Sequence, residues 1–215
     1  MEDSTVSCKS LPLYPQNIRL ANGMMINDVP IIAGGDESSN QISEVYKLDY
    51  FGNSWVLLGN MAKKRNQFAV AELNGGVWAM GGFASGSWNF QSSTEIIYTN
   101  GTILDGPDLP ETRARHCAVT LPNGKVAIMG GRTSPSVITK DVLIYDPSTS
   151  TYTSGPDMFY EHENFACVTF YSDKHGGRPV ILGAGGYSLR KAEIYDYDNG
   201  VWEQSKLFLI QLRYR

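Results

Sequence analysis

The sequence lacks the features of several large protein classes. It has 18 Lys and Arg against 22 Asp and Glu, so it carries no excess of positive charge with which to bind nucleic acid. No apolar run approaches the ~20 residues that a membrane-spanning helix needs. Residues Met1 to Thr5 are acidic and polar, unlike the start of a signal peptide. These absences predict a cytoplasmic protein with no nucleic-acid or membrane partner, or an extracellular one if the N-terminus is truncated.

Cysteine and histidine are also scarce. The three cysteines are Cys8, Cys117 and Cys167, an odd number without CxxC spacing. This pattern predicts neither a disulfide framework nor a zinc site, and it favours free cysteines buried as small apolar residues. The three histidines lie in different segments without the HxxxH or HExxH spacing of a zinc site. We therefore expect no metal, no cofactor and no catalytic residue.

What the sequence does contain is a repeat. Four apolar runs each end in a glycine doublet, and the second glycines of the doublets are 47, 49 and 55 residues apart. A period near fifty residues indicates an array of one supersecondary unit. Adjacent glycines after an apolar run predict a strand end at which φ turns positive or a Cβ would clash. The doublets are Gly34 and Gly35, Gly81 and Gly82, Gly130 and Gly131, and Gly185 and Gly186.

Each unit contains four short apolar runs, which predict four strands. A turn signal such as Asn123-Gly124 separates the first two runs, and Asn-Gly between apolar runs is typical of a β-hairpin. A polar loop follows the doublet, and a third run and a turn come next. An aromatic (Trp55, Tyr152 or Trp202) then opens the fourth run in three of the units, six residues after an Asp. No helical period interrupts this order, so the predicted fold is all-β.

The third unit shows the full pattern and allows a comparison with a known family. It has Leu109-Pro110, Arg113, His116, the doublet, Tyr145-Asp146-Pro147 and Tyr152. The pattern recurs in register in all four units, over residues 11–206, and it resembles the kelch repeat. The resemblance implies a kelch-type β-propeller with four blades of four antiparallel strands. The predicted organisation is an N-terminal tail (1–10), four repeats (11–60, 61–109, 110–157 and 158–206) and a C-terminal tail (207–215).

Four blades are fewer than kelch propellers usually carry. An open array would leave a strand edge and an apolar blade face uncovered. Three interpretations stay open: a compact four-bladed ring, a ring completed by a partner chain, or a fragment of a longer chain that supplies further blades.

Function in a propeller is expected in the loops at one face, because the strands are committed to packing. By resemblance to kelch adaptors, that face consists of the loops after the doublets and the loops that lead into each first strand. The segment from Phe83 to Phe90 carries aromatics that the repeat does not require, and aromatic and arginine side chains dominate binding hot spots. The expected partner-binding residues are Arg65, Phe83, Trp88, Phe90, Arg113, Arg115, Arg132, Tyr187 and Arg190. The alternative is that Trp88 and Phe90 pack over a blade edge.

The resemblance therefore favours a protein-interaction module, either a kelch-repeat scaffold or a substrate-recognition propeller. The arginines favour an acidic peptide as the partner. One alternative is an extracellular or glycan-binding propeller, which a glycan on the sequon Asn100-Gly101-Thr102 would favour. A fragment of a galactose-oxidase-like enzyme is the other alternative, although the sequence has no Tyr and His cluster for copper. We expect that the chain is not an enzyme.

Overall fold

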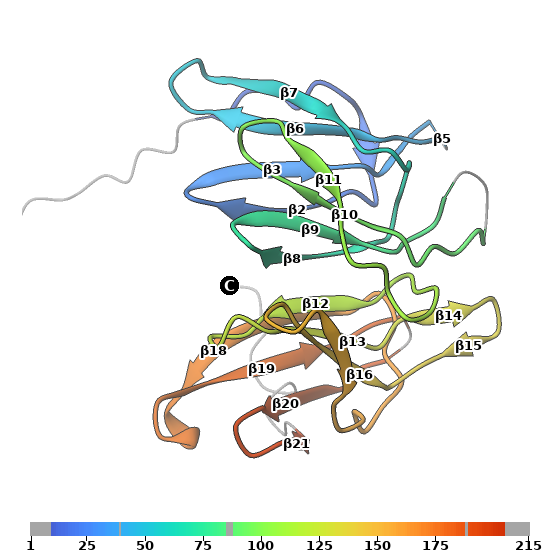
Figure 1. The fold of residues 1–215 in the computed structure, drawn as a ribbon, viewed down its shortest axis with the longest axis vertical. Helices are drawn as coiled ribbons and strands as arrows, with labels where there is room; N and C mark the ends of the chain where they lie inside the picture. The colour runs from blue at the N-terminus through green and yellow to red at the C-terminus, as the bar shows by residue number, and fades with distance from the viewer. Residues whose placement is uncertain (1–9, 39, 85–87, 188, 205–215) are drawn as a thin grey trace, which may run out of the picture.

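The structure is a computed structural model that describes residues 10–38, 40–84, 88–187 and 189–204. These residues form four antiparallel sheets of four strands each (Figure 1). The first sheet contains β2 (Asn22–Ile26), β3 (Val29–Ala33), β6 (Glu44–Asp49) and β7 (Ser54–Asn60), and the second contains β8 (Ala69–Leu73), β9 (Gly76–Met80), β10 (Thr94–Ile97) and β11 (Ile103–Asp105). The third contains β12 (Cys117–Thr120), β13 (Val126–Met129), β16 (Val142–Asp146) and β17 (Thr151–Ser154), and the fourth contains β18 (Ala166–Ser172), β19 (Arg178–Ala184), β20 (Ala192–Asp196) and β21 (Val201–Gln204). The predicted all-β fold with four blades of four antiparallel strands is confirmed.

Short elements occupy several predicted loops. β1 (Ile18–Arg19), β4 (Asp36–Glu37) and β5 (Asn40–Gln41) form a small sheet beside the first blade. β14 (Arg132–Ser134) and β15 (Val137–Ile138) form a hairpin after the third doublet, and a 3₁₀ turn (Asp173–His175) links β18 to β19. Within the described ranges no helix is long and apolar enough to cross a membrane.

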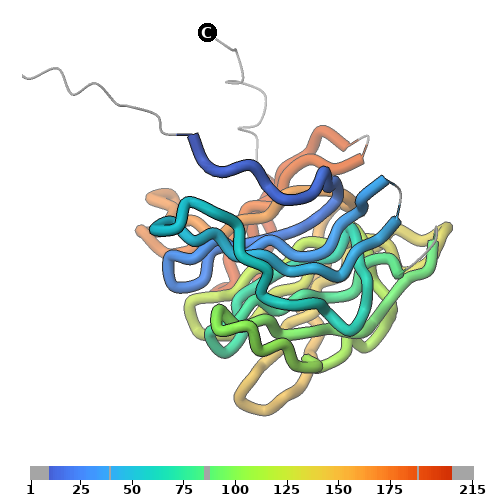
Figure 2. The backbone as a smooth tube through the Cα atoms, turned by 90° about the horizontal axis from the view of Figure 1, so that it is seen from above, coloured from blue at the N-terminus to red at the C-terminus, as the bar shows by residue number. Residues whose placement is uncertain are grey.

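Apolar side chains fill the spaces between successive blades. On β9, Val77 belongs to the cluster shared with the first blade, and its neighbour Trp78 belongs to the cluster shared with the third. Neighbouring residues on a strand point to opposite faces, so a central blade is buried on both sides. A third cluster, with Met129 and Ile181, joins the third and fourth blades. The first blade lies nearest the viewer when the molecule is seen from above (Figure 2).

In three of the blades, the aromatic near the start of the fourth strand forms a hydrogen bond with the segment that precedes the blade. Each of these aromatics donates a hydrogen bond from its polar tip to a proline carbonyl, which satisfies the polar group of a large, partly buried ring. The bonds are Trp55 Nε1 to the Pro12 carbonyl (3.2 Å), Tyr152 Oη to Pro107 (2.9 Å) and Trp202 Nε1 to Pro156 (2.8 Å).

A disulfide joins the third and fourth blades. Cys117 on β12 is bonded to Cys167 on β18, with their Cα atoms 6.0 Å apart. The prediction of free cysteines is therefore wrong for this pair, and Cys8 lies outside the described residues. The two positions are 50 residues apart, which is one repeat. They therefore occupy corresponding strands of adjacent blades, and that periodicity is the signal that the count of cysteines did not reveal.

Candidate interaction surface

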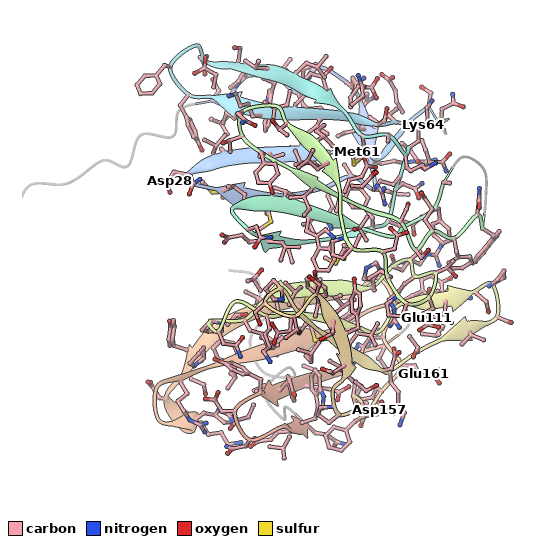
Figure 3. The ribbon with its side chains drawn as sticks, viewed as in Figure 1. Asp28, Met61, Lys64, Glu111, Asp157 and Glu161 are labelled. Atoms are coloured by element: carbon pink, nitrogen blue, oxygen red, sulfur yellow. A yellow bond between two sulfur atoms is a disulfide. The ribbon has the colours of Figure 1, made fainter. Side chains whose placement is uncertain are left out.

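The connections between strands divide between two ends of the molecule. The loops after the doublets and the loops into the first strands share one end. Lys64, Glu111 and Glu161, from the loops into the second, third and fourth blades, lie on the same side of the molecule, and Asp28 in the β2–β3 turn lies at the opposite side (Figure 3). The predicted partner-binding residues all belong to the first of these ends.

Three of the predicted binding residues are buried, and two of them are arginines. Arg65 and Arg113 are each 0% exposed. Arg65 donates through Nη1 to the carbonyls of Gly81 (2.8 Å) and Ser93 (2.9 Å), and through Nη2 to Glu95 (2.8 Å). Burial lowers the pKa of Arg65, and the hydrogen bond to Glu95 opposes that shift. The expectation that Arg65 and Arg113 meet a partner is wrong, because both side chains are enclosed within their own blades.

The same bonding recurs in the third and fourth blades. Arg113 donates to the Gly130 carbonyl (2.9 Å) and to both carboxylate oxygens of Asp141 (2.6 and 2.8 Å). In the fourth blade a histidine replaces the arginine: His162 contacts the Gly185 carbonyl (2.7 Å) through Nδ1 and Glu193 (3.0 Å) through Nε2. The regular spacing of these three buried side chains in the sequence marks them as parts of the repeat.

The glycine doublets form backbone hydrogen bonds with the start of the next blade. The second glycines of the first three doublets donate N–H groups to the carbonyl of the buried Arg or His that follows, at 2.9 Å for Gly35 to Arg65, 2.8 Å for Gly82 to Arg113 and 2.7 Å for Gly131 to His162. All eight doublet glycines have positive φ, a conformation in which other residues are strained. The predicted structural role of the doublets follows directly from this geometry.

Five of the predicted aromatics and arginines do come together. We call Phe83, Trp88, Phe90, Arg115 and Arg132 the aromatic–arginine patch. Phe83 is buried and its ring lies 4.7 Å from that of Phe90 and 5.9 Å from that of Trp88. Trp88 is 46% exposed. Phe90 is partly buried against Phe83, whereas Trp88 is exposed, so the alternative in which both Trp88 and Phe90 pack over a blade edge does not describe Trp88. Partner binding at these residues stays a prediction.

Two guanidinium groups support the exposed indole. The Cζ atoms of Arg115 and Arg132 lie 5.4 and 5.5 Å from the Trp88 ring centroid, within the range of cation–π attraction. Arg115 also lies 5.6 Å from the Phe83 ring. The patch therefore combines residues from loops of the second and third repeats at one place.

Glu163 holds both arginines in place. Its carboxylate accepts from Arg132 Nε (2.7 Å) and Nη2 (3.0 Å) and from Arg115 Nη1 (3.0 Å), and Arg115 Nε also donates to Gln67 (2.7 Å). These bonds lower the pKa of Glu163, with Arg132 as the largest contributor, and raise that of Arg132. Two guanidinium groups and one carboxylate leave the cluster with one net positive charge. Glu163 and Gln67 were not among the predicted site residues.

The last two predicted residues, Tyr187 and Arg190, lie outside the patch. Tyr187 is exposed, and its N–H donates to the carbonyl of Glu163 (2.9 Å). Arg190 is exposed in the segment that follows the fourth doublet. Both therefore stay available for a partner.

A cavity lies between the blades, along the axis around which they are arranged. First strands of all four sheets line this cavity of about 510 Å³. His116 lies at one end of it, is 6% exposed, and has no hydrogen-bond partner for either ring nitrogen within the described part of the chain. Burial, with the nearby positive charge of Arg113, lowers the pKa of His116 to about 3. Its imidazole is therefore neutral near pH 7. The described residues contain no group of three or more His, Cys, Asp and Glu that could hold a metal ion.

Comparison with known proteins agrees with this geometry. The Kelch motif family matches residues 113–159, from the buried arginine of the third blade to its last turn. The chain is a kelch-repeat protein. It is 28% identical over 138 residues to the Kelch-like protein 15 of Homo sapiens and 25% identical over 138 residues to the Kelch-like protein 24 of Mus musculus. Each match covers 64% of this chain and 22% of the relative.

More distant proteins share the repeat or the fold. Beta-scruin of Limulus polyphemus is 29% identical over 116 residues, which cover 51% of this chain and 12% of that protein. The solved structure of YjhT has a TM-score of 0.72 at 19% identity and covers 91% of this kelch-repeat chain and 67% of its own. That likeness concerns the fold alone. The Kelch-like relatives support a protein-interaction module in general terms.

Proposed function

We propose that this kelch-repeat chain binds a partner protein through the aromatic–arginine patch, without catalysing a reaction. The observation that supports the proposal most directly is the half-exposed Trp88 ring, which contacts two arginines that Glu163 fixes in place. A large aromatic that is pre-positioned on a rigid base loses little conformational freedom when a partner covers it. The strands beneath the patch belong to blade cores, so the patch needs no rearrangement to bind.

The charge of the cluster indicates the partner's chemistry. One net positive charge remains after Glu163 is counted, so an extended peptide with a carboxylate beside an apolar anchor fits the patch. Because Glu163 already pairs with both arginines, we expect the contribution of charge to be modest. Affinity should therefore depend mainly on the indole and should fall only slightly as salt screens the single charge.

A displayed library of random peptides provides a test that needs no known partner. Peptides selected on the folded chain should lose about 30-fold or more in affinity on Trp88→Ala, the effect of removing a hot-spot residue. The matched control is Phe51→Ala, which removes a fully exposed aromatic from the β6–β7 turn at the other end of the molecule. Phe51→Ala should leave affinity unchanged, and both variants should unfold at the wild-type denaturant concentration.

The outcomes distinguish a partner-binding role of Trp88 from a structural role. Selected peptides that bind Trp88→Ala as tightly as wild type would overturn the proposal. So would a large loss of stability in Trp88→Ala, because the indole would then be part of the core. Peptides enriched in Asp and Glu would support the acidic partner, and peptides without them would restrict the proposal to the aromatic anchor.

A further inference from the structure

The turn between β10 and β11 presents a possible modification site at the protein surface. Asn100-Gly101-Thr102 is the one Asn-X-Ser/Thr triplet in the sequence. Asn100 and Thr102 are both exposed. The turn is closed by the Gly101 N–H to the Tyr98 carbonyl (3.0 Å) and the Tyr98 N–H to the Thr102 carbonyl (2.9 Å). Asn100 Oδ1 accepts from the Thr102 N–H (2.9 Å), a bond in which the amide nitrogen Nδ2 takes no part.

The fold has room for a large group at this position. β10 pairs antiparallel with both β9 and β11, so the β10–β11 turn lies at the opposite end of the blade from the β9–β10 loop. The β9–β10 loop carries Phe83, Trp88 and Phe90. A bulky substituent on Asn100 would therefore stand in solvent and leave the aromatic–arginine patch free.

An independent observation concerns the chemical environment in which the chain folds. The Cys117–Cys167 disulfide links strands of two different blades, and both residues lie along the axial cavity. Disulfides form and persist in secretory and extracellular compartments, whereas cytosolic thiols are kept reduced. Attachment of a glycan to an Asn-X-Ser/Thr triplet takes place along the same secretory route. The disulfide thus gives the exposed triplet a context that the triplet alone lacks.

We propose that Asn100 carries an N-linked oligosaccharide and that the protein matures in an oxidising secretory compartment. In the transfer, Asn100 Nδ2 forms a bond to C1 of the first sugar of a lipid-pyrophosphate-linked oligosaccharide. The sugar–phosphate bond breaks, the lipid pyrophosphate leaves, and Nδ2 gives up one proton. This proposal replaces the expected cytoplasmic location and stands independently of the proposed partner binding.

The test uses the full chain purified from the cells that produce it. Its intact mass should fall to the mass of the polypeptide on treatment with peptide N-glycosidase. Alkylation without reductant should leave Cys117 and Cys167 unlabelled, and reduction should expose both. An intact mass that glycosidase does not change, or free thiols at these two cysteines, would overturn the proposal.

Matched variants locate the modification. Asn100→Gln and Thr102→Ala should each abolish the mass shift, the second without removing the asparagine. Asn123 provides a positive control, because its Oδ1 accepts from the Lys125 N–H (3.1 Å) in a similar exposed turn, and Lys125→Thr completes a triplet there. Modification of the Lys125→Thr chain at Asn123 but not at Asn100 would overturn the proposal, since it would show that the route is available and that Asn100 is not used.

Discussion

The third and fourth blades contain the same glycine doublet in different surroundings. In the third, Gly130 and Gly131 have φ values of 58° and 92°, and a Cβ on Gly130 would lie 2.8 Å from the His162 carbonyl oxygen of the following blade. In the fourth, Gly185 and Gly186 have φ values of 75° and 122°, and a Cβ on Gly185 would meet nothing within 4 Å. Positive φ is common to both doublets, but no atom lies as close to Gly185 as in the third blade.

Hydrogen bonding shows the same difference. Gly131 donates to the carbonyl of His162 in the following blade, whereas the backbone bonds of the described residues include none from the Gly186 N–H. The comparison separates two reasons for glycine in the repeat. The turn requires a residue that tolerates positive φ in every blade, and the packing of a following blade adds a steric reason. The choice of residue at a doublet is thus more restricted at a junction between two described blades than at the fourth blade.

The largest expected difference in unfolding free energy is between replacing Arg65, buried in the second blade, and replacing Arg178, partly exposed in the fourth. Arg65→Met leaves Glu95 buried at 3% exposure without its charged partner, and breaking such a pair costs about 3–5 kcal/mol. Arg178→Met in β19 removes a side chain that is 39% exposed, and Asp196 keeps its bonds from Asn199, so the cost should be about 1 kcal/mol. Urea unfolding followed by tryptophan fluorescence measures both. Equal losses would show that the inner and outer blades do not differ in this respect.

The second contrast tests the doublets themselves. Gly130→Ala adds a clash with the His162 carbonyl oxygen to the strain of positive φ and should destabilise the chain by about 3 kcal/mol. Gly185→Ala meets only the strain and should cost about 1 kcal/mol. The difference between the two unfolding free energies measures the contribution of the following blade. A Gly185→Ala variant as unstable as Gly130→Ala would mean that residues outside the described ranges pack against the fourth doublet.

These contrasts also mark the limit of what the sequence predicts. The fold follows from it because the turns, doublets and apolar runs are local and repeat in phase. The burial of Arg65 could not be read from its neighbours Lys63 and Lys64, since its partners Gly81, Ser93 and Glu95 lie 16 to 30 residues away.

The candidate site was predicted in part. The aromatics between Phe83 and Phe90 stand out because the repeat does not explain them, and Arg115 and Arg132 share a loop end with them. Glu163 did not stand out, because its importance depends on the approach of three loops from different repeats. The Cys117–Cys167 bond was missed for a similar reason, since a pairing between blades becomes visible only when the period is applied to the cysteines.

The smallest expected effect is a pH dependence at a blade junction. His116 packs against Gly131, and its pKa is lowered to about 3, against about 6.5 in the unfolded chain. Between these values the unfolded state binds more protons, so stability should fall as pH decreases through 6.5, by about 1 kcal/mol at pH 5.5. The pKa values of Asp141 and Glu163 are lowered, so these carboxylates stay ionised between pH 7.5 and 5.5. His116→Leu should remove this part of the pH dependence in urea unfolding at pH 7.5 and 5.5. If His116→Leu loses as much stability as wild type over this range, the buried imidazole is not its source, and the junction around Gly131 is insensitive to protonation.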